Sequence, residues 1–472
     1  METITYLNIK VEGTPITKIT RINIENAVGT YGTAKVTGEV DYNAGMDYVQ
    51  RSQPGTAITI STSAAGQPGI LFMGVLSKAG IKKTDQYALL DLEMKSTACN
   101  LDKKKENQSF QNTGSTYEEV MNKALAGEAT LNLLVPDKAT GTLIMRYQET
   151  SWAFVKRMAS ALGAPVSTDT VSKTPILTIG IPNTGKSYTL SDVEYDSALE
   201  DGGTASTQIK TAQAVALGDS IQYGSESSIV TKYKADIQDG VLKTTVSLTS
   251  QYDAEGYGAD TSGTGATAGT GTSLDAGSGN SSQIMNTQAS GKMFKGIVQA
   301  VQMDKVQVHL VDIDSSYDGG GDFWFPYSTA YSSSDGSGFY CMPAVGDTVR
   351  VFFPSDNEAD AFAASSVNVS PLDNPLHKKW RSPAGKEILL TEEGMFITCK
   401  ESKIFINLED EKGITIYSDK DINVNSMSNM TLYAKENITL QAENKILLST
   451  GESYIDITDK LIQMGAEQIM IN

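Results

Sequence analysis

The chain has 472 residues, of which 40% are hydrophobic and 20% are charged, a composition typical of a folded protein of two to four domains. Its formal net charge of −18 disfavours binding to nucleic acid or anionic lipid, because like charges repel. Three scattered cysteines and two isolated histidines, His309 and His377, provide neither a disulfide framework nor a metal-ligand spacing, so we expect no cofactor and no metal site.

Residues 1–251 are expected to form a β-rich domain of two barrel-like parts with two helical insertions. Alternating segments such as 34–40 and 87–94 predict strands with one buried face. A Ser/Thr-x-x-Glu capping box predicts a helix over 116–126. A second apolar stripe at helical spacing predicts a helix over 151–162.

Residues 252–290 are rich in Gly, Ser, Thr and Ala, which predicts a linker. Residues 291–369 are expected to form a small barrel of the OB type (the oligonucleotide/oligosaccharide-binding fold). The five strands expected in this barrel span 296–301, 305–310, 323–326, 339–347 and 348–353. This fold alone assigns no ligand.

After a connector at 370–387, residues 388–472 repeat one small unit eleven times, in which two aliphatic-type residues flank a single position. An apolar pair spaced i, i+2 is typical of a short strand with one buried face. The spacing is eight residues throughout 414–446. The predicted inward pairs are Ile388/Leu390, Met395/Ile397, Ile404/Ile406, Ile414/Ile416, Ile422/Val424, Met430/Leu432, Ile438/Leu440, Ile446/Leu448, Ile455/Ile457, Ile462/Met464 and Ile469/Ile471.

Two architectures are open for this repeat. Eight residues per unit place only about two inward side chains on each strand, too few for one chain to close a solenoid coil easily. We therefore expect three chains to wind into an intertwined β-helix (a β-prism), with the neighbours of each strand coming from other chains and the pairs forming its core. The alternative is an antiparallel meander or a single-chain β-solenoid.

Two short motifs precede the repeat. The first contains Tyr147, Glu149, Trp152 and Phe154 and opens the second helix; the second contains Pro343, Gly346 and Asp347 within the small barrel. With the terminal repeat, they occur in an order that resembles the VgrG spikes of type VI secretion systems and the hub-and-needle proteins of contractile phage tails. We expect the motif residues to be scaffold: Trp152 and Phe154 anchor the helix, and Gly346 with Asp347 forms a tight turn.

The resemblance implies a mainly β homotrimer. Its hub would contact the hexameric ring of an inner tube protein and other baseplate proteins, and its spike would pierce a target envelope. The particle would be a phage tail, a tailocin, an extracellular injection system or a secretion machine, assembled in the cytoplasm and delivered outside the cell or into a target envelope. We expect no signal peptide and no transmembrane segment.

We expect no enzymatic activity, since no carboxylate lies in a catalytic motif and the connector is too short for a lysozyme domain. The last 90 residues hold no histidine, unlike needles with an iron-bound apex, so we expect a separate tip protein of the PAAR type. The alternative function is a trimeric tail fibre or receptor-binding adhesin. The two motifs argue against this alternative, because they resemble hub and spike sequences.

Overall fold

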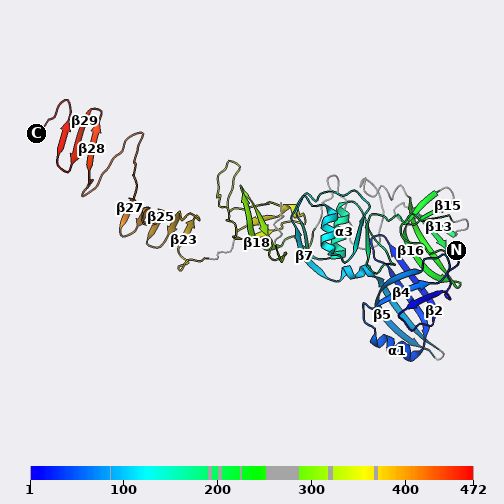
Figure 1. The fold of residues 1–472 in the computed structure, drawn as a ribbon. Coiled ribbons are helices and arrows are strands. Elements are labelled where there is room, and N and C mark those ends of the chain that lie inside the picture. Colours follow the sequence, from blue (N-terminus) through cyan, green and yellow to red (C-terminus); the bar gives the residue numbers. More distant parts are fainter. Residues whose placement is uncertain are drawn as a thin grey trace. The chain divides into compact units, whose positions relative to one another are not determined.

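A computed structural model describes residues 2–84, 87–189, 194–199, 205–223, 226–250, 286–316, 323–365 and 370–470 (Figure 1). The chain divides into two compact units, Met1–Val367 and Asn368–Asn472. Strands greatly outnumber helices among the described residues, so the mainly β class expected from the sequence is confirmed. No helix of these residues combines the length and hydropathy needed to cross a bilayer.

Twelve strands of the described residues form one large sheet in the first unit. Pairing of β2 with β16, from Lys232 opposite Ala27 to Asp236 opposite Asn23, joins the two β regions that the sequence separates. Both regions also contribute to one hydrophobic core, so they are not two independent barrels. The strands are β1 Ile9–Glu12, β2 Lys18–Ala27, β3 Thr33–Val40, β4 Ala57–Thr62, β5 Ile70–Lys83, β6 Ala88–Ser96, β12 Ser187–Thr189, β13 Glu194–Leu199, β14 Ala205–Thr211, β15 Ser220–Tyr223, β16 Glu226–Gln238 and β17 Val241–Ser250.

One helix of this region was not expected from the sequence. Helix α1, Tyr42–Arg51, begins behind Asp41, whose side chain accepts a hydrogen bond from the Ala44 backbone N–H. An aspartate at this position satisfies one of the free N–H groups of the first turn. The helix lies against the sheet mainly through partly buried Tyr48 and Val49.

The two expected helices lie in a smaller α/β part with its own core. Helix α2, Tyr117–Leu125, is capped at its N-terminus by the predicted capping box, formed by Thr116 and Glu119. Helix α3, Ser151–Ala161, begins behind Thr150, whose hydroxyl accepts from the Ala153 N–H. The other elements of this part are the 3₁₀ helix η1 Thr97–Asp102 and strands β7 Lys105–Phe110, β8 Thr130–Leu133, β9 Ile144–Thr150, β10 Val166–Thr168 and β11 Ile176–Ile179.

The small barrel contains five strands, in the order β20-β19-β18-β21-β22. A bridge between Tyr327 and Ala363 closes the sheet, so the strand order supports the OB-type prediction. The strands are β18 Met293–Gln302, β19 Lys305–His309, β20 Phe325–Pro326, β21 Thr348–Phe352 and β22 Phe362–Ala364, with the 3₁₀ helix η2 Glu358–Asp360 before the last.

The strand expected at 339–347 is absent from the barrel, and β22 is the fifth strand instead. Pro343 has no N–H to donate, and Gly346 has φ +92°, so this segment cannot continue a regular ladder.

The C-terminal end of the predicted linker, 252–290, differs from the prediction. Residues 252–285 lie outside the described part, whereas Asn286 and Ala289 are buried against the barrel.

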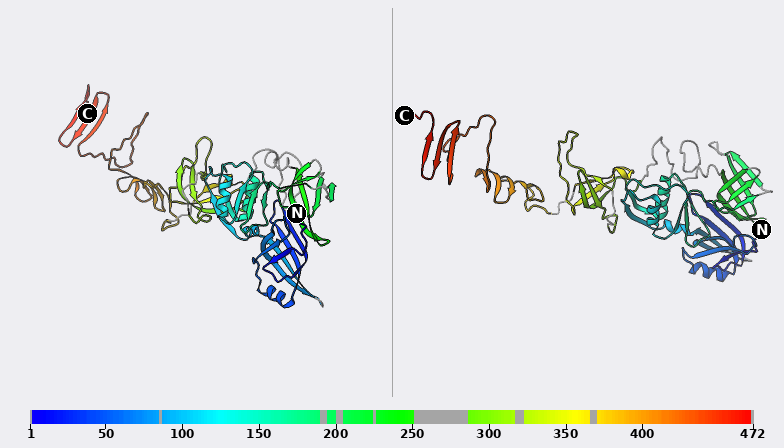
Figure 2. Two further views of the ribbon diagram at one scale, coloured as in Figure 1. Left: turned by 45° about the vertical axis from the view of Figure 1, so that its right-hand side comes forward. Right: turned by 45° about the horizontal axis from the view of Figure 1, so that its top comes forward.

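The second unit holds two antiparallel meanders (Figure 2). Meander 1 comprises β23 Lys378–Arg381, β24 Glu387–Leu390, β25 Gly394–Lys400, β26 Ile404–Glu409 and β27 Gly413–Ser418. Meander 2 comprises β28 Lys445–Thr450, β29 Ser453–Thr458 and β30 Ile462–Gly465. The predicted connector therefore already contains a strand, β23.

Within both meanders, each strand pairs with the next strand of the same chain. In the described single chain these segments therefore have the pairing of the meander alternative, and the expected strands from other chains stay a prediction. Residues 419–444, between the meanders, contain no strand. This segment carries the middle of the eight-residue repeat, which predicted strands at 422–424, 430–432 and 438–440.

Candidate assembly site

Meander 1 carries a continuous row of aliphatic side chains across four strands. Ile388 lies opposite Ile397, Ile397 opposite Ile406, and Ile406 opposite Ile416. Directly opposed residues of an antiparallel pair project from the same face, so the row lies on one face. Ile416, at the end of the row on edge strand β27, is 61% exposed.

A second row lies beside the first. Leu390 is opposite Met395, Met395 is opposite Leu408, and Leu408 is opposite Ile414. The first three are between 38% and 40% exposed, and Ile414 is 71% exposed. Leu408 was not among the predicted inward residues, although it continues the alternation of Ile404 and Ile406 on β26.

Meander 2 repeats the arrangement with three strands. Ile446, Ile457 and Ile462 form one cross-strand row, and Leu448, Ile455 and Met464 form the other. The second row lines an open hollow of about 420 Å³, which also contacts Ile469. Ile471, the last predicted inward residue, lies outside the described residues.

The strand-free segment 419–444 exposes all three of its aliphatic pairs. The exposed fractions are 56% for Ile422, 68% for Val424, 53% for Met430, 71% for Leu432, 54% for Ile438 and 60% for Leu440. Extended backbone without a partner strand leaves its N–H and C=O groups without ladder bonds. Apart from local hydrogen bonds such as that from the Asp419 N–H to the Lys403 carbonyl, the backbone of this segment therefore lacks ladder partners in the described chain, and its aliphatic side chains are exposed.

The first motif residues pack inside the first unit. Trp152 is 6% exposed and meets the Tyr31 ring edge-on, with centroids 5.6 Å apart. Phe154 is fully buried and stacks on Phe110 at 5.6 Å. Tyr147 contacts Phe294 of the barrel edge-on at 4.9 Å. These ring contacts pack the three aromatic residues against neighbouring elements of the first unit.

Glu149, the remaining residue of this motif, belongs to a buried ionic network. Its carboxylate accepts two hydrogen bonds from the Arg157 guanidinium, of 3.0 and 2.7 Å. Arg157 also pairs with Glu358 of the barrel at 3.2 Å, and Glu358 accepts a 2.6 Å hydrogen bond from Asn286. One guanidinium thus links helix α3 to the barrel, through residues 201 positions apart in the chain.

The second motif forms a turn on the barrel. Gly346 donates its N–H to the Val298 carbonyl at 2.8 Å, and the Val298 N–H donates to the Asp347 carbonyl at 2.9 Å. The Asp347 carboxylate accepts from the Ala344 N–H at 2.8 Å, and Pro343 is buried. The turn expected at Gly346 and Asp347 is therefore present, and it closes onto β18.

The Glu358 carboxyl is 2% exposed, and burial raises its pKa from 4.5 to about 7. Because the folded pKa lies above the unfolded one, this group stabilises the fold most below pH 4.5, and the contribution is lost as the pH rises through about 7. The difference between the folded and unfolded pKa values corresponds to roughly 3 kcal/mol in the free energy of unfolding.

We therefore expect Glu358→Gln to flatten the pH dependence of stability. Between pH 5 and pH 8 the parent protein should lose roughly 2 to 3 kcal/mol relative to this variant, as measured by urea unfolding at both pH values. Parallel pH profiles for the two proteins would show that Glu358 does not titrate in this range.

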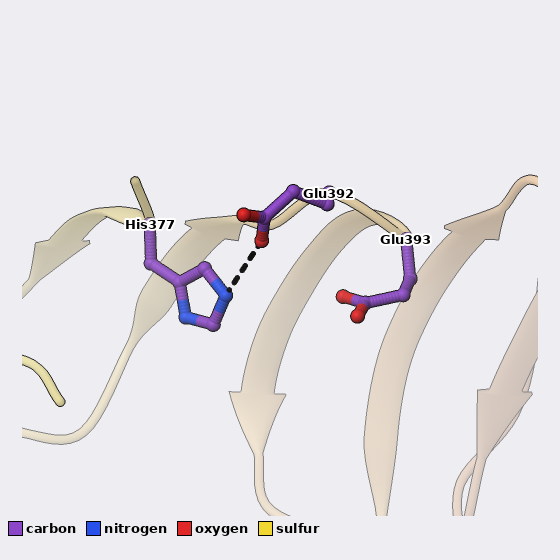
Figure 3. Close-up of side chains that lie close together, drawn as sticks. All are labelled: His377, Glu392 and Glu393. Atoms are coloured by element: carbon purple, nitrogen blue, oxygen red, sulfur yellow. Dashed lines mark hydrogen bonds and ion pairs between the residues drawn. The ribbon is translucent and has the colours of Figure 1, made fainter. Parts of the chain in front are cut away.

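A cluster of one histidine and two glutamates lies at one end of meander 1 (Figure 3). His377 Nε2 is 3.1 Å from Glu392 Oε2, and Glu393 lies beside them. The cluster belongs to turns that the strand register brings together, since Lys378 lies opposite Leu390 and Leu390 opposite Met395. Backbone and Asn374 hydrogen bonds, together with nearby His377, lower the pKa of Glu392.

The comparisons with known proteins concern the fold. A family model described as the Alg8 N-terminal domain matches residues 1–217, less than half of the chain. No curated protein matches. Among solved structures, the E. coli c3393 protein is similar, with 14% identity and a TM-score of 0.53 over 76% of this chain and 99% of that chain. It is described as a component of the type VI secretion system with structural similarity to the T4 bacteriophage tail proteins gp27 and gp5. The two proteins share a fold.

Two further solved structures are similar at lower scores. The Francisella PdpA-VgrG complex matches with 8% identity and a TM-score of 0.48, over 87% of each chain. The prophage MuSo2 43 kDa tail protein of Shewanella oneidensis matches with 11% identity and a TM-score of 0.42, over 52% of this chain and 98% of that chain.

Proposed function

We propose that the chain is the structural hub and spike of a contractile injection machine, joining the inner tube to the tip and piercing the target envelope. The observation that carries this proposal is the fold shared with c3393, a type VI secretion component similar to two phage tail proteins. That likeness covers 76% of this chain and 99% of the c3393 chain.

In this proposal the protein is a homotrimer. Both meanders and the segment 419–444 leave most of the predicted inward residues exposed, and aliphatic surface of this extent is costly in water. Two further copies supply matching rows and bring partner strands to 419–444. The chain then forms a three-chain needle whose core contains the predicted pairs.

The needle transmits load when the machine contracts. Cross-strand hydrogen bonds and a continuous apolar core distribute an axial force over many small interactions. The hub, residues 1–251, contacts the hexameric ring of the inner tube protein and the surrounding baseplate proteins. The role is mechanical and requires no catalysis, cofactor or nucleic acid.

A separate tip protein of the PAAR type completes the needle in this proposal. Strand β30 pairs only with β29 among the described residues, so one edge of meander 2 presents backbone groups without a partner. Exposed strand edges are sites of association with other chains. The hollow beside Met464 and Ile469 adds apolar surface close to this edge.

A trimeric tail fibre or adhesin is the alternative, because it too would cover the exposed rows of the meanders. Electron microscopy of intact particles tests the choice, using the full chain with an antibody-detectable tag inserted in the predicted linker. Label on the tail axis supports the spike, and label at the particle periphery supports the fibre. Particles without label on either position would contradict both functions.

A further inference from the structure

We propose that His377, Glu392 and Glu393 form a binding site for a divalent transition-metal ion, Zn²⁺ being the best match. This site is separate from the apolar rows and does not depend on the proposed function. It would fix the first strand of meander 1 to the turn between β24 and β25.

The geometry of the three side chains carries the inference. One ligand atom from each residue lies within 4.8 Å of the other two. Two ligands of one zinc ion, each about 2.1 Å from it, are at most roughly 4.2 Å apart, so small side-chain rotations suffice. Figure 3 shows the Glu393 carboxylate directed toward His377 and Glu392.

The donor set selects the class of ion. One imidazole nitrogen with two carboxylate oxygens suits zinc and similar ions, whereas calcium and magnesium prefer oxygen ligands alone. With three protein ligands, solvent would complete the coordination.

The surroundings favour a cation at this point. Glu392 and Glu393 are adjacent carboxylates on one turn, and the Glu393 carboxylate has no hydrogen bond or ion pair with another described residue. Glu392 is held in place by Asn374, whose amide lies 3.3 Å from both carboxylate oxygens. A divalent ion would offset the repulsion between the two carboxylates and use this positioned ligand.

The position of the site gives it a structural effect. Strand β23 is an edge strand that pairs only with β24 among the described residues. His377 directly precedes β23, while the two glutamates follow β24. A metal bound to all three would therefore link two segments that otherwise depend on a short ladder, and so resist separation of the edge strand.

Zinc titration of the purified full-length protein tests the site. We expect one Zn²⁺ per chain by equilibrium dialysis with elemental analysis, and at least about tenfold weaker binding in His377→Ala and in Glu393→Gln. Titration with Co²⁺ gives a second readout, because loss of the imidazole ligand should change the visible absorption spectrum of the bound ion.

Glu401→Gln is the matched control, since Glu401 is an exposed carboxylate on another turn of meander 1. It should bind zinc like the parent, and all variants should keep the parent circular dichroism spectrum. Two outcomes would overturn the proposal. One is equal zinc uptake by the parent and His377→Ala, and the other is no zinc uptake by the parent when the zinc concentration is 100 times the protein concentration. The ligands belong to one chain, so a monomer that binds zinc would support this site while contradicting the trimer.

Discussion

Replacing Ile422 with aspartate should prevent the chain from assembling as a trimer. Ile422 begins the first aliphatic pair of the strand-free segment and is 56% exposed in the single chain. In the proposed needle, three copies of the aspartate would meet near one axis. Each buried carboxylate without a partner costs several kcal/mol, and the three charges also repel one another.

Sedimentation of the purified proteins measures this effect. The parent should sediment as three chains of 50.5 kDa each, and Ile422→Asp as a single chain. Asn423→Asp is the matched control, because alternation along a strand places residue 423 on the opposite face from Ile422. A stable Ile422→Asp trimer would show that Ile422 does not face the core, and a monomeric parent would contradict the trimer itself.

Local signals in the sequence predicted local structure well. The capping box at Thr116 and the apolar stripe from Trp152 correctly located helices α2 and α3, because both signals act within a few residues. The paired aliphatic residues from Ile388 to Ile416 correctly predicted strands with one apolar face. Helix α1 was missed, although Asp41 provided an N-cap signal, since Asn43 and Gly45 weaken its helical pattern.

The choice of partner strand could not be predicted in the same way. Alternation assigns a face to each residue of β2 but contains no information about its pairing with β16, more than 200 residues away. In the repeat, the same alternation fits a partner from the same chain or from another one. In the two meanders of the described chain, the turns are short enough for consecutive strands to pair.

The charged residues of the candidate sites show the same limit. The first motif identified Glu149, but Arg157 and Glu358 were not singled out, because only the fold brings helix α3 against the barrel. Arg157 lies about 140° round helix α3 from Trp152, outside the apolar stripe, so the helical pattern gave no signal of a buried charge. His377 and Glu392 were likewise too far apart for a local metal motif, and only the register of meander 1 brings them together.

Replacing Arg157 with methionine should be strongly destabilising. The substitution preserves much of the side-chain volume but leaves Glu149 and Glu358, which are 11% and 2% exposed, without their cationic partner. Removing one member of a buried ionic network typically costs 3–5 kcal/mol. Urea unfolding at pH 8 measures the loss as a lower midpoint at an unchanged slope.

Arg51→Met is the matched control, because Arg51 pairs with Asp47 on the surface and is 80% exposed. Exposed pairs contribute little, so this change should alter stability by less than about 1 kcal/mol. Adding Glu358→Gln to Arg157→Met should restore part of the loss, since it removes one of the two unpaired buried charges. Equal effects of the two methionine variants, or no recovery in the double variant, would show that the charges of the network do not determine how the barrel is held to helix α3.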